Sequence, residues 1–243
     1  MTPRHVVLLF VIGASGCDAA YSAPEPPTTG RFEHDMMVRF HMHENFDLLR
    51  AVEKLLLRGR LADATSLARA IAEAPDEPGL GTWAVQATKV RDLAAALGRA
   101  PNLDEACKRE ARLAVACAGC HADVGLAAEL TAVPVLPPDK PQIAVRMARH
   151  LWATDRLWEA IVMGGNDPWK QGLDVLAATP LPFDTGTYGR SGFAKQLQQL
   201  ATGARKQSSK DDLPARGRVY GEMLTVCVGC HTAPVDVTLP SAK

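Results

Sequence analysis

The chain has 243 residues, six cysteines and equal numbers of basic and acidic side chains, 27 of each, so its formal net charge is zero. This length is enough for one or two small domains. Neither a basic run nor a basic face is evident, which removes the usual electrostatic signature of nucleic-acid binding. We therefore predict no nucleic-acid partner.

Residues 1–17 have the pattern of a bacterial lipoprotein signal peptide. A basic region at Arg4 precedes an apolar run over 6–12, and the small residues 14–16 precede Cys17. The apolar run is too short to remain as a span of a bilayer about 30 Å thick. We expect a periplasmic chain anchored to a membrane by lipid on Cys17, with inner and outer membrane both left open. An ordinary signal peptide with an incidental cysteine is the alternative.

Proline-rich segments divide the mature chain. Residues 18–30 are rich in Pro, Ala, Ser and Thr, which predicts an extended tether. A second proline-rich segment, 134–140, separates two stretches of roughly 100 residues each. We therefore predict a first domain at 31–133, a second domain at 141–236 and a C-terminal tail at 237–243.

An apolar stripe with helical spacing occurs once in each domain. It comprises Val38, Met42, Phe46, Leu49 and Leu56 in the first domain and, 105 positions later, Ile143, Met147, Leu151, Thr154 and Ile161. Steps of three, four and seven residues predict an amphipathic helix. The stripes end before Gly59 and Gly164, which are suited to end a helix in the left-handed conformation.

Each domain has room for three further helices. We expect two of them at about 61–74 and 82–97 in the first domain and at about 167–178 and 193–204 in the second. The last helix begins near Asn102 in the first domain and near Asp211 or Asp212 in the second, with Pro214 suited to its first turn. Few stretches alternate like strands. The predicted fold class is all-α, as two tandem four-helix bundles.

The last helix of each domain carries a C-x-x-C-H motif. Its residues are Cys117, Cys120 and His121 in the first domain and, 110 positions later, Cys227, Cys230 and His231. This is the attachment signature of c-type haem, because two thiols one turn apart form thioethers to the porphyrin and the next histidine becomes an axial ligand. We predict two covalently attached haem c groups, with His121 and His231 as proximal iron ligands.

A zinc site formed by the cysteine pairs is the non-haem alternative. The separation of the pairs, the trailing histidines and the export signal disfavour it. Four cysteines belong to the motifs and Cys17 to the anchor, which leaves Cys107 alone and argues against a disulfide framework. We expect Cys107 to be a small buried apolar residue rather than a redox or metal-binding residue.

Four helices with the motif on the last one resemble the cytochrome c-prime family and its low-spin cytochrome c-556 relatives. The resemblance covers about 31–124 and 140–235, and it implies a haem packed within each bundle. In the c-prime branch the face opposite the proximal histidine is open, whereas in the c-556 branch a methionine of the first helix closes it. The family often has a basic residue soon after the haem histidine, and this chain has none within four residues of His121 or His231.

Met42 and Met147 occupy equivalent positions of the two stripes, and each is expected to face the bundle interior. A methionine thioether is a suitable distal ligand for haem iron. Filling of the core is the alternative role for both residues. His43 and His150 are the competing candidates for distal ligands. A shift of two residues in the alignment of the two domains would place them at equivalent positions, but it would misalign the apolar stripes.

The leading functional hypothesis is a dihaem electron-transfer cytochrome that exchanges single electrons with redox protein partners. A protein that binds or senses nitric oxide or carbon monoxide through an open distal face is the alternative. An enzyme, in the form of a dihaem peroxidase, is a third hypothesis, for which neither a distal base nor a mobile ligand can be assigned. The redox partners, the potentials and the formation of a homodimer are left open.

Overall fold

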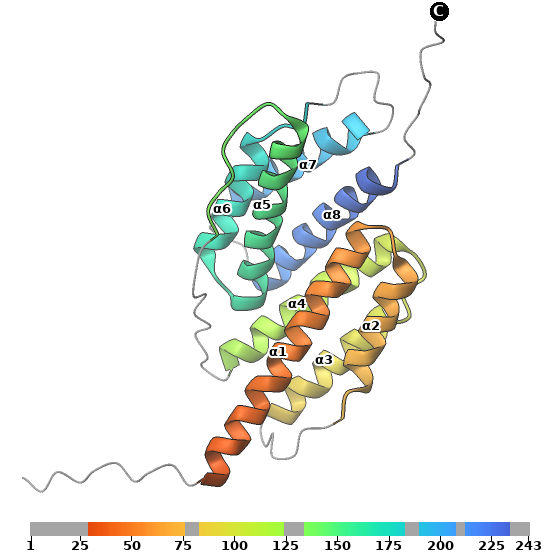
Figure 1. Ribbon diagram of the computed structural model, residues 1–243, viewed down its shortest axis with the longest axis vertical. Helices are drawn as coiled ribbons and strands as arrows, with labels where there is room; N and C mark the ends of the chain where they lie inside the picture. The colour runs from red at the N-terminus through yellow and green to blue at the C-terminus, as the bar shows by residue number, and fades with distance from the viewer. Residues whose placement is uncertain (1–28, 76–82, 124–133, 183–189, 208–211, 234–243) are drawn as a thin grey trace, which may run out of the picture.

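The computed structural model describes residues 29–75, 83–123, 134–182, 190–207 and 212–233. Within these ranges it contains eight α-helices and no strand (Figure 1). The helices are α1 (Thr29–Leu57), α2 (Leu61–Glu73), α3 (Ala84–Leu97), α4 (Leu103–Asp123), α5 (Ile143–Met163), α6 (Asn166–Ala178), α7 (Arg190–Gln207) and α8 (Leu213–Thr232). The predicted all-α class is confirmed. The signal peptide with Cys17, nearly all of the tether and the C-terminal tail lie outside the described residues.

Local signals account for several helix ends. Gly59 and Gly164 follow α1 and α5 with φ angles of +72° and +73°, as expected for glycines that end a helix. The side chains of Asn102 and Asp212 accept backbone N–H groups three residues further on, at 2.9 and 2.8 Å. These caps start α4 and α8 because they satisfy donors that have no partner within a helix.

The helices pack in chain order within each half of the molecule: α1 on α2, α2 on α3 and α3 on α4, and likewise from α5 to α8. The proline-rich linker 134–140 is non-helical, and the Trp152 indole of α5 donates to the Pro134 carbonyl at 2.8 Å. The two halves meet through α4 and α8, which cross in opposite directions near the middle of the molecule (Figure 1). In addition, α4 packs on α5 and α8 packs on α1.

Small residues allow α4 and α8 to approach closely. A Cβ atom added to Gly217 would lie 2.5 Å from Cγ2 of Val115, and one added to Gly221 would lie 3.2 Å from Cα of Lys108. Both distances are shorter than ordinary carbon contacts. Glycine is therefore required at this crossing for lack of space.

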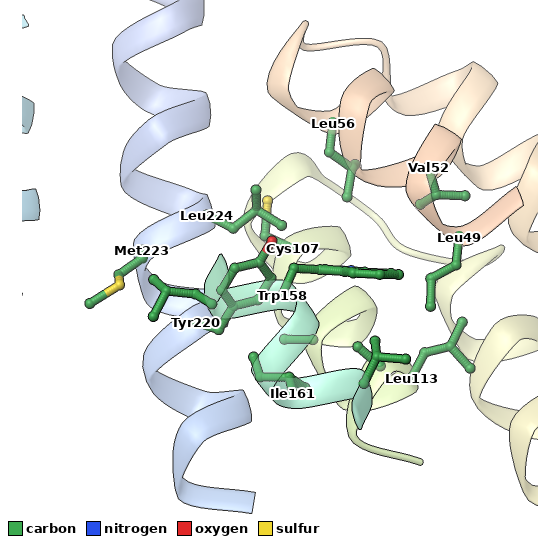
Figure 2. Packing of buried hydrophobic residues seen from close by; sticks show 14 of the residues in the cluster. Leu49, Val52, Leu56, Cys107, Leu113, Trp158, Ile161, Tyr220, Met223 and Leu224 are labelled. Atoms are coloured by element: carbon green, nitrogen blue, oxygen red, sulfur yellow. The ribbon is translucent and has the colours of Figure 1, made fainter. Parts of the chain in front are cut away.

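One continuous cluster of buried apolar side chains spans both halves. Figure 2 shows part of this cluster, with Leu49, Val52 and Leu56 from α1, Cys107 and Leu113 from α4, Trp158 and Ile161 from α5, and Tyr220, Met223 and Leu224 from α8. The two halves therefore share a core around the α4–α8 crossing.

The apolar stripes of α1 and α5 are buried only in their C-terminal parts. Leu49 is 3 % exposed, whereas Met42 is 37 % exposed and Leu151 is 54 % exposed. Met42 is thus exposed, contrary to the expectation that it faces the interior, and Met147 is half-buried. The physical reason on α1 is length, because its 29 residues span roughly 43 Å while the 13 residues of α2 span roughly 20 Å.

Candidate functional site

The two C-x-x-C-H motifs occupy the last turns of α4 and α8. The i, i+3 and i+4 spacing on a helix brings the two thiols and the imidazole of each motif to one face. The four motif cysteines are half-buried, His121 is half-buried and His231 is exposed.

The surroundings of α4 and α8 repeat with the sequence. From 102 to 120, every residue is buried, half-buried or exposed in the same way as the residue 110 positions later. The agreement stops at the histidines, since His231 is more exposed than His121. The two motifs therefore occupy equivalent positions in the fold and differ in the exposure of the histidine.

His121 is oriented by the other half of the molecule. Its Nδ1 atom lies 3.2 Å from the carbonyl oxygen of Val162 in the last turn of α5. A carbonyl only accepts, so Nδ1 carries the proton and the Nε2 lone pair is free to bind a metal. The Val162 carbonyl is available because the last carbonyls of a helix lack intrahelical donors, and α5 ends at Met163, just before the cap Gly164.

The end of α8 has different neighbours. The ring of Phe193 from α7 covers Gly229, where an added Cβ would lie 2.5 Å from Cε1 of the ring. Arg190 donates to the Ala233 carbonyl at 3.4 Å. Desolvation, followed by the Arg190 guanidinium, lowers the pKa of His231, so its imidazole is neutral and able to act as a ligand at neutral pH.

The first cysteine of each motif is held as a neutral thiol. Burial is the largest cause that raises the pKa of Cys117 and of Cys227 to about 12 in each case. The neighbouring motif cysteine raises each pKa further, and a carboxylate contributes as well: Glu110 for Cys117 and Glu53 for Cys227. Neutral sulfur in an apolar setting suits a thioether better than a thiolate ligand.

Cys107 is fully buried, as expected, and burial raises the pKa of its thiol to about 12. It lies on the face of α4 that meets α8, and its carbonyl oxygen is near Gly221. The equivalent position of α8, 110 residues later, is Gly217. A small residue is therefore needed at both positions of the crossing, and the thiol is inert.

The predicted distal residues lie on α1 and α5. In Figure 1, α1 and α4 run in opposite directions, so the N-terminal half of α1 extends toward the C-terminal end of α4. By sequence, Met42 belongs to the N-terminal half of α1 and His121 to the last turn of α4. His43 is exposed. His150 is buried, and its Nε2 atom lies 2.7 Å from the Thr179 carbonyl. That nitrogen is therefore a donor, and burial lowers the pKa of the ring.

Sequence reasoning missed a buried polar cluster between the motif helices, formed by Arg50, Glu53, Glu110, Trp158 and Tyr220. A signal for it existed, because Glu53 falls on the apolar stripe between Leu49 and Leu56. An acid on an apolar face is rarely buried without a partner. The partners themselves lie far away in the sequence.

Comparison of the chain with protein-family models, with curated proteins and with solved structures finds no match. Among the described residues, no group of three or more His, Cys, Asp or Glu side chains is arranged to hold a metal ion. No helix in the described ranges is both long and apolar enough to cross a membrane.

Proposed function

We propose that this protein is a dihaem c-type cytochrome that carries single electrons between redox protein partners. Its two four-helix bundles would correspond to about 31–133 and 141–236. A haem c bound at each motif supplies reversible one-electron iron chemistry. Cys117 and Cys120 would hold one haem and Cys227 and Cys230 the other, with His121 and His231 as proximal ligands.

The observation that carries this proposal is the orientation of His121. An imidazole that ligates a metal through Nε2 commonly donates its Nδ1 proton to a backbone carbonyl, which sets the tautomer and strengthens the ligand. His121 has this arrangement with Val162. It stands next to the two thiols of Cys117 and Cys120 on the same helical face, in the order that covalent haem attachment requires.

Exposed apolar side chains fit the same proposal. Phe46 of α1 is 36 % exposed, and Leu151, the residue 105 positions later on α5, is also exposed. Large apolar side chains at equivalent positions of both halves would be covered by an apolar porphyrin. Met42 and Met147 stand one turn earlier on these helices and are our candidates for distal ligands, with sulfur that suits haem iron.

The exposure of Met42 favours a second candidate function at the first motif, the binding of a small gas such as carbon monoxide at an open distal face. Met147 is half-buried, so the same argument does not apply to the second motif. His150 is a weaker ligand candidate than Met147, because its Nε2 atom already donates to Thr179.

Export is part of the proposal. Covalent haem attachment to C-x-x-C-H fits an exported chain, which agrees with the signal-peptide pattern of residues 1–17. We propose a periplasmic protein anchored to a membrane by lipid on Cys17.

The covalent attachment is tested by haem content. Wild-type protein matured in a periplasm should hold two haems per chain after denaturation, and the double substitution Cys117→Ser and Cys120→Ser should leave one. Cys107→Ala is the matched control and should keep both. A wild-type chain without covalent haem would refute the proposed function.

Spectra with and without carbon monoxide distinguish the two candidate functions. Met147→Ala should convert one haem from low spin to high spin, while Met163→Ala, on the same helix, should not. If the first haem is high spin and binds carbon monoxide in the wild type, and Met42→Ala does not change its spectrum, gas binding is favoured at that motif. A wild type that is low spin at both haems and unaffected by carbon monoxide favours electron transfer.

A further inference from the structure

A buried polar cluster lies between α1, α4, α5 and α8. Glu110 is fully buried, and Glu53, Trp158 and Tyr220 are each at most 2 % exposed. The indole N–H of Trp158 donates to Oε1 of Glu110 at 3.1 Å, and the hydroxyl of Tyr220 donates to Glu53. Figure 2 shows both aromatic side chains inside the shared core.

The two hydrogen bonds are related by the internal repeat. Trp158 is the residue 105 positions after Glu53, and Tyr220 is the residue 110 positions after Glu110. Each acid of the first half therefore corresponds to an aromatic donor of the second half. Both bonds cross between the halves, one from α8 to α1 and the other from α5 to α4.

The negative charges of the two acids are compensated differently. Arg50 donates to Glu53 and to Asp155, so a cation stands beside Glu53. Glu110 receives only the indole N–H, and its Oε2 atom is buried without a hydrogen-bond partner. An ionised carboxylate is costly in such a place, because Arg50 makes its direct ion pairs with Glu53 and Asp155 and not with Glu110.

Glu110 therefore retains a proton under conditions where an ordinary glutamate is ionised. Its pKa is raised to about 8, first by burial and then by the charge of Glu53. The groups that face it are Arg50 and Glu53 from α1, Trp158 from α5, Tyr220 from α8, and Cys107 and Cys117 on its own helix.

The cluster lies midway between the two motifs. Glu110 precedes Cys117 by seven residues and Tyr220 precedes Cys227 by the same number, which is roughly 10 Å along each helix. The charge of Glu110 acts on Cys117, and the charge of Glu53 acts on Cys227. Electrostatic interaction is mutual, so a change of charge at either motif acts in turn on the carboxylates of Glu53 and Glu110.

We propose that Glu110, coupled to Glu53, is a proton-binding site that links electron transfer at the two motifs to pH. Glu110 takes one proton from solvent onto a carboxylate oxygen when a haem iron accepts one electron from a redox protein, and it releases the proton when the electron leaves. Lowering the charge at the iron favours the neutral carboxylic acid. This inference rests on the proposed function.

The test is a redox titration of the haem-loaded protein between pH 5 and pH 9. In the wild type the midpoint potential should fall as pH rises, because reduction binds a proton. The limit is a tenfold change in the oxidised-to-reduced ratio per pH unit, or about 59 mV for one electron. Glu110→Gln should flatten this dependence. Glu222→Gln, an exposed acid five residues before Cys227, is the matched control and should retain it.

Two further measurements identify the group. The reduced-minus-oxidised infrared spectrum should contain a carboxylic C=O band that is absent from Glu110→Gln. Trp158→Phe keeps an aromatic ring but removes the N–H that stabilises the Glu110 carboxylate, so the pH dependence should move to higher pH. This variant also serves if Glu110→Gln fails to fold.

A wild-type midpoint that does not vary with pH, or a dependence that survives in Glu110→Gln, would overturn the inference while leaving the haem assignment intact. A chain that lacks haem would instead refute the proposed function, and the inference with it. Haem content, measured before the titration, separates these two failures.

Discussion

Glu110 shows how a single buried acid couples the fold to pH. The unfolded chain exposes this carboxyl to water, where its pKa is that of an ordinary glutamate, whereas the folded chain raises the pKa to about 8. Between these values the folded state binds more protons than the unfolded state. The contribution of Glu110 to stability is therefore fully present at acidic pH and is lost as pH rises toward and through 8.

We expect Glu110→Gln to gain stability relative to the wild type as pH rises from 5 to 8. Glutamine has a similar shape and does not ionise, so the pH-dependent loss at this position disappears. The difference in the free energy of unfolding should grow by at most about 1.4 kcal/mol per pH unit. Urea denaturation followed by circular dichroism at each pH measures it. Parallel stability profiles for the two proteins would contradict the raised pKa.

At the scale of elements, the α4–α8 crossing joins the two halves. Gly217 meets the side chain of Val115, whereas Gly172 of α6 meets the backbone oxygen of Ala153 on α5, 2.7 Å from an added Cβ. A side chain can be shortened by substitution, but a backbone oxygen cannot. Both glycines are therefore needed because an added Cβ would overlap a neighbouring atom. A second substitution can relieve this overlap at Gly217 but cannot remove the backbone oxygen beside Gly172.

We expect Gly217→Ala to destabilise the protein by about 1–2 kcal/mol, because overpacking outweighs the gain in helix propensity. Combination with Val115→Ala should recover much of this loss, which a double-mutant cycle of unfolding free energies measures. Gly203→Ala in α7, where an added Cβ meets nothing within 4 Å, is the control and should be neutral or stabilising. Equal costs of Gly217→Ala with and without Val115 would show that the crossing is not closely packed.

At the scale of the whole molecule, helices from both halves contribute to one buried cluster. The Glu53–Tyr220 and Glu110–Trp158 bonds and the contact of His121 with Val162 all cross between the halves. The first half therefore neither buries its own acids nor orients its own motif alone. Units that share a core in this way are expected to unfold together.

We expect Leu56→Ala to lower the unfolding temperature of the entire protein in one step. Leu56 is fully buried on α1, and its truncation should cost about 2–5 kcal/mol. Calorimetry should show a single endotherm that moves to lower temperature as a whole. Helices α5 to α7 should unfold in this same transition, although the substitution lies on α1. A second endotherm that stays at the wild-type temperature would mean that the halves fold independently.

Much of the helical organisation could be predicted because its causes are local. The capping side chains of Asn102 and Asp212 act within three residues, and Gly59 and Gly164 end helices by their own backbone conformation. The exposure of Met42 could not be predicted from the stripe, because periodicity specifies a face of the helix but not how far the neighbouring helices cover it.

The candidate site likewise has a part that the sequence predicts and a part that it does not. The spacing within each C-x-x-C-H motif is enough to bring two thiols and an imidazole together on one helical face. The donor to Glu53 lies 167 positions away, and the carbonyl beside His121 lies 41 positions away. No short-range rule connects such residues.

The sequence by itself determined where the eight helices begin and end, to within a few residues in most cases. It also determined which helix ends carry the motifs and which repeat relates the two halves. These features follow from hydrophobic period, capping and spacing, which act over a few residues. Only the tertiary structure decided that α4 packs on α8, that Glu110 is buried without a direct ion pair and that α5 orients His121. These outcomes depend on which surfaces fit together after the helices form, and complementarity between distant surfaces has no local signature in the chain.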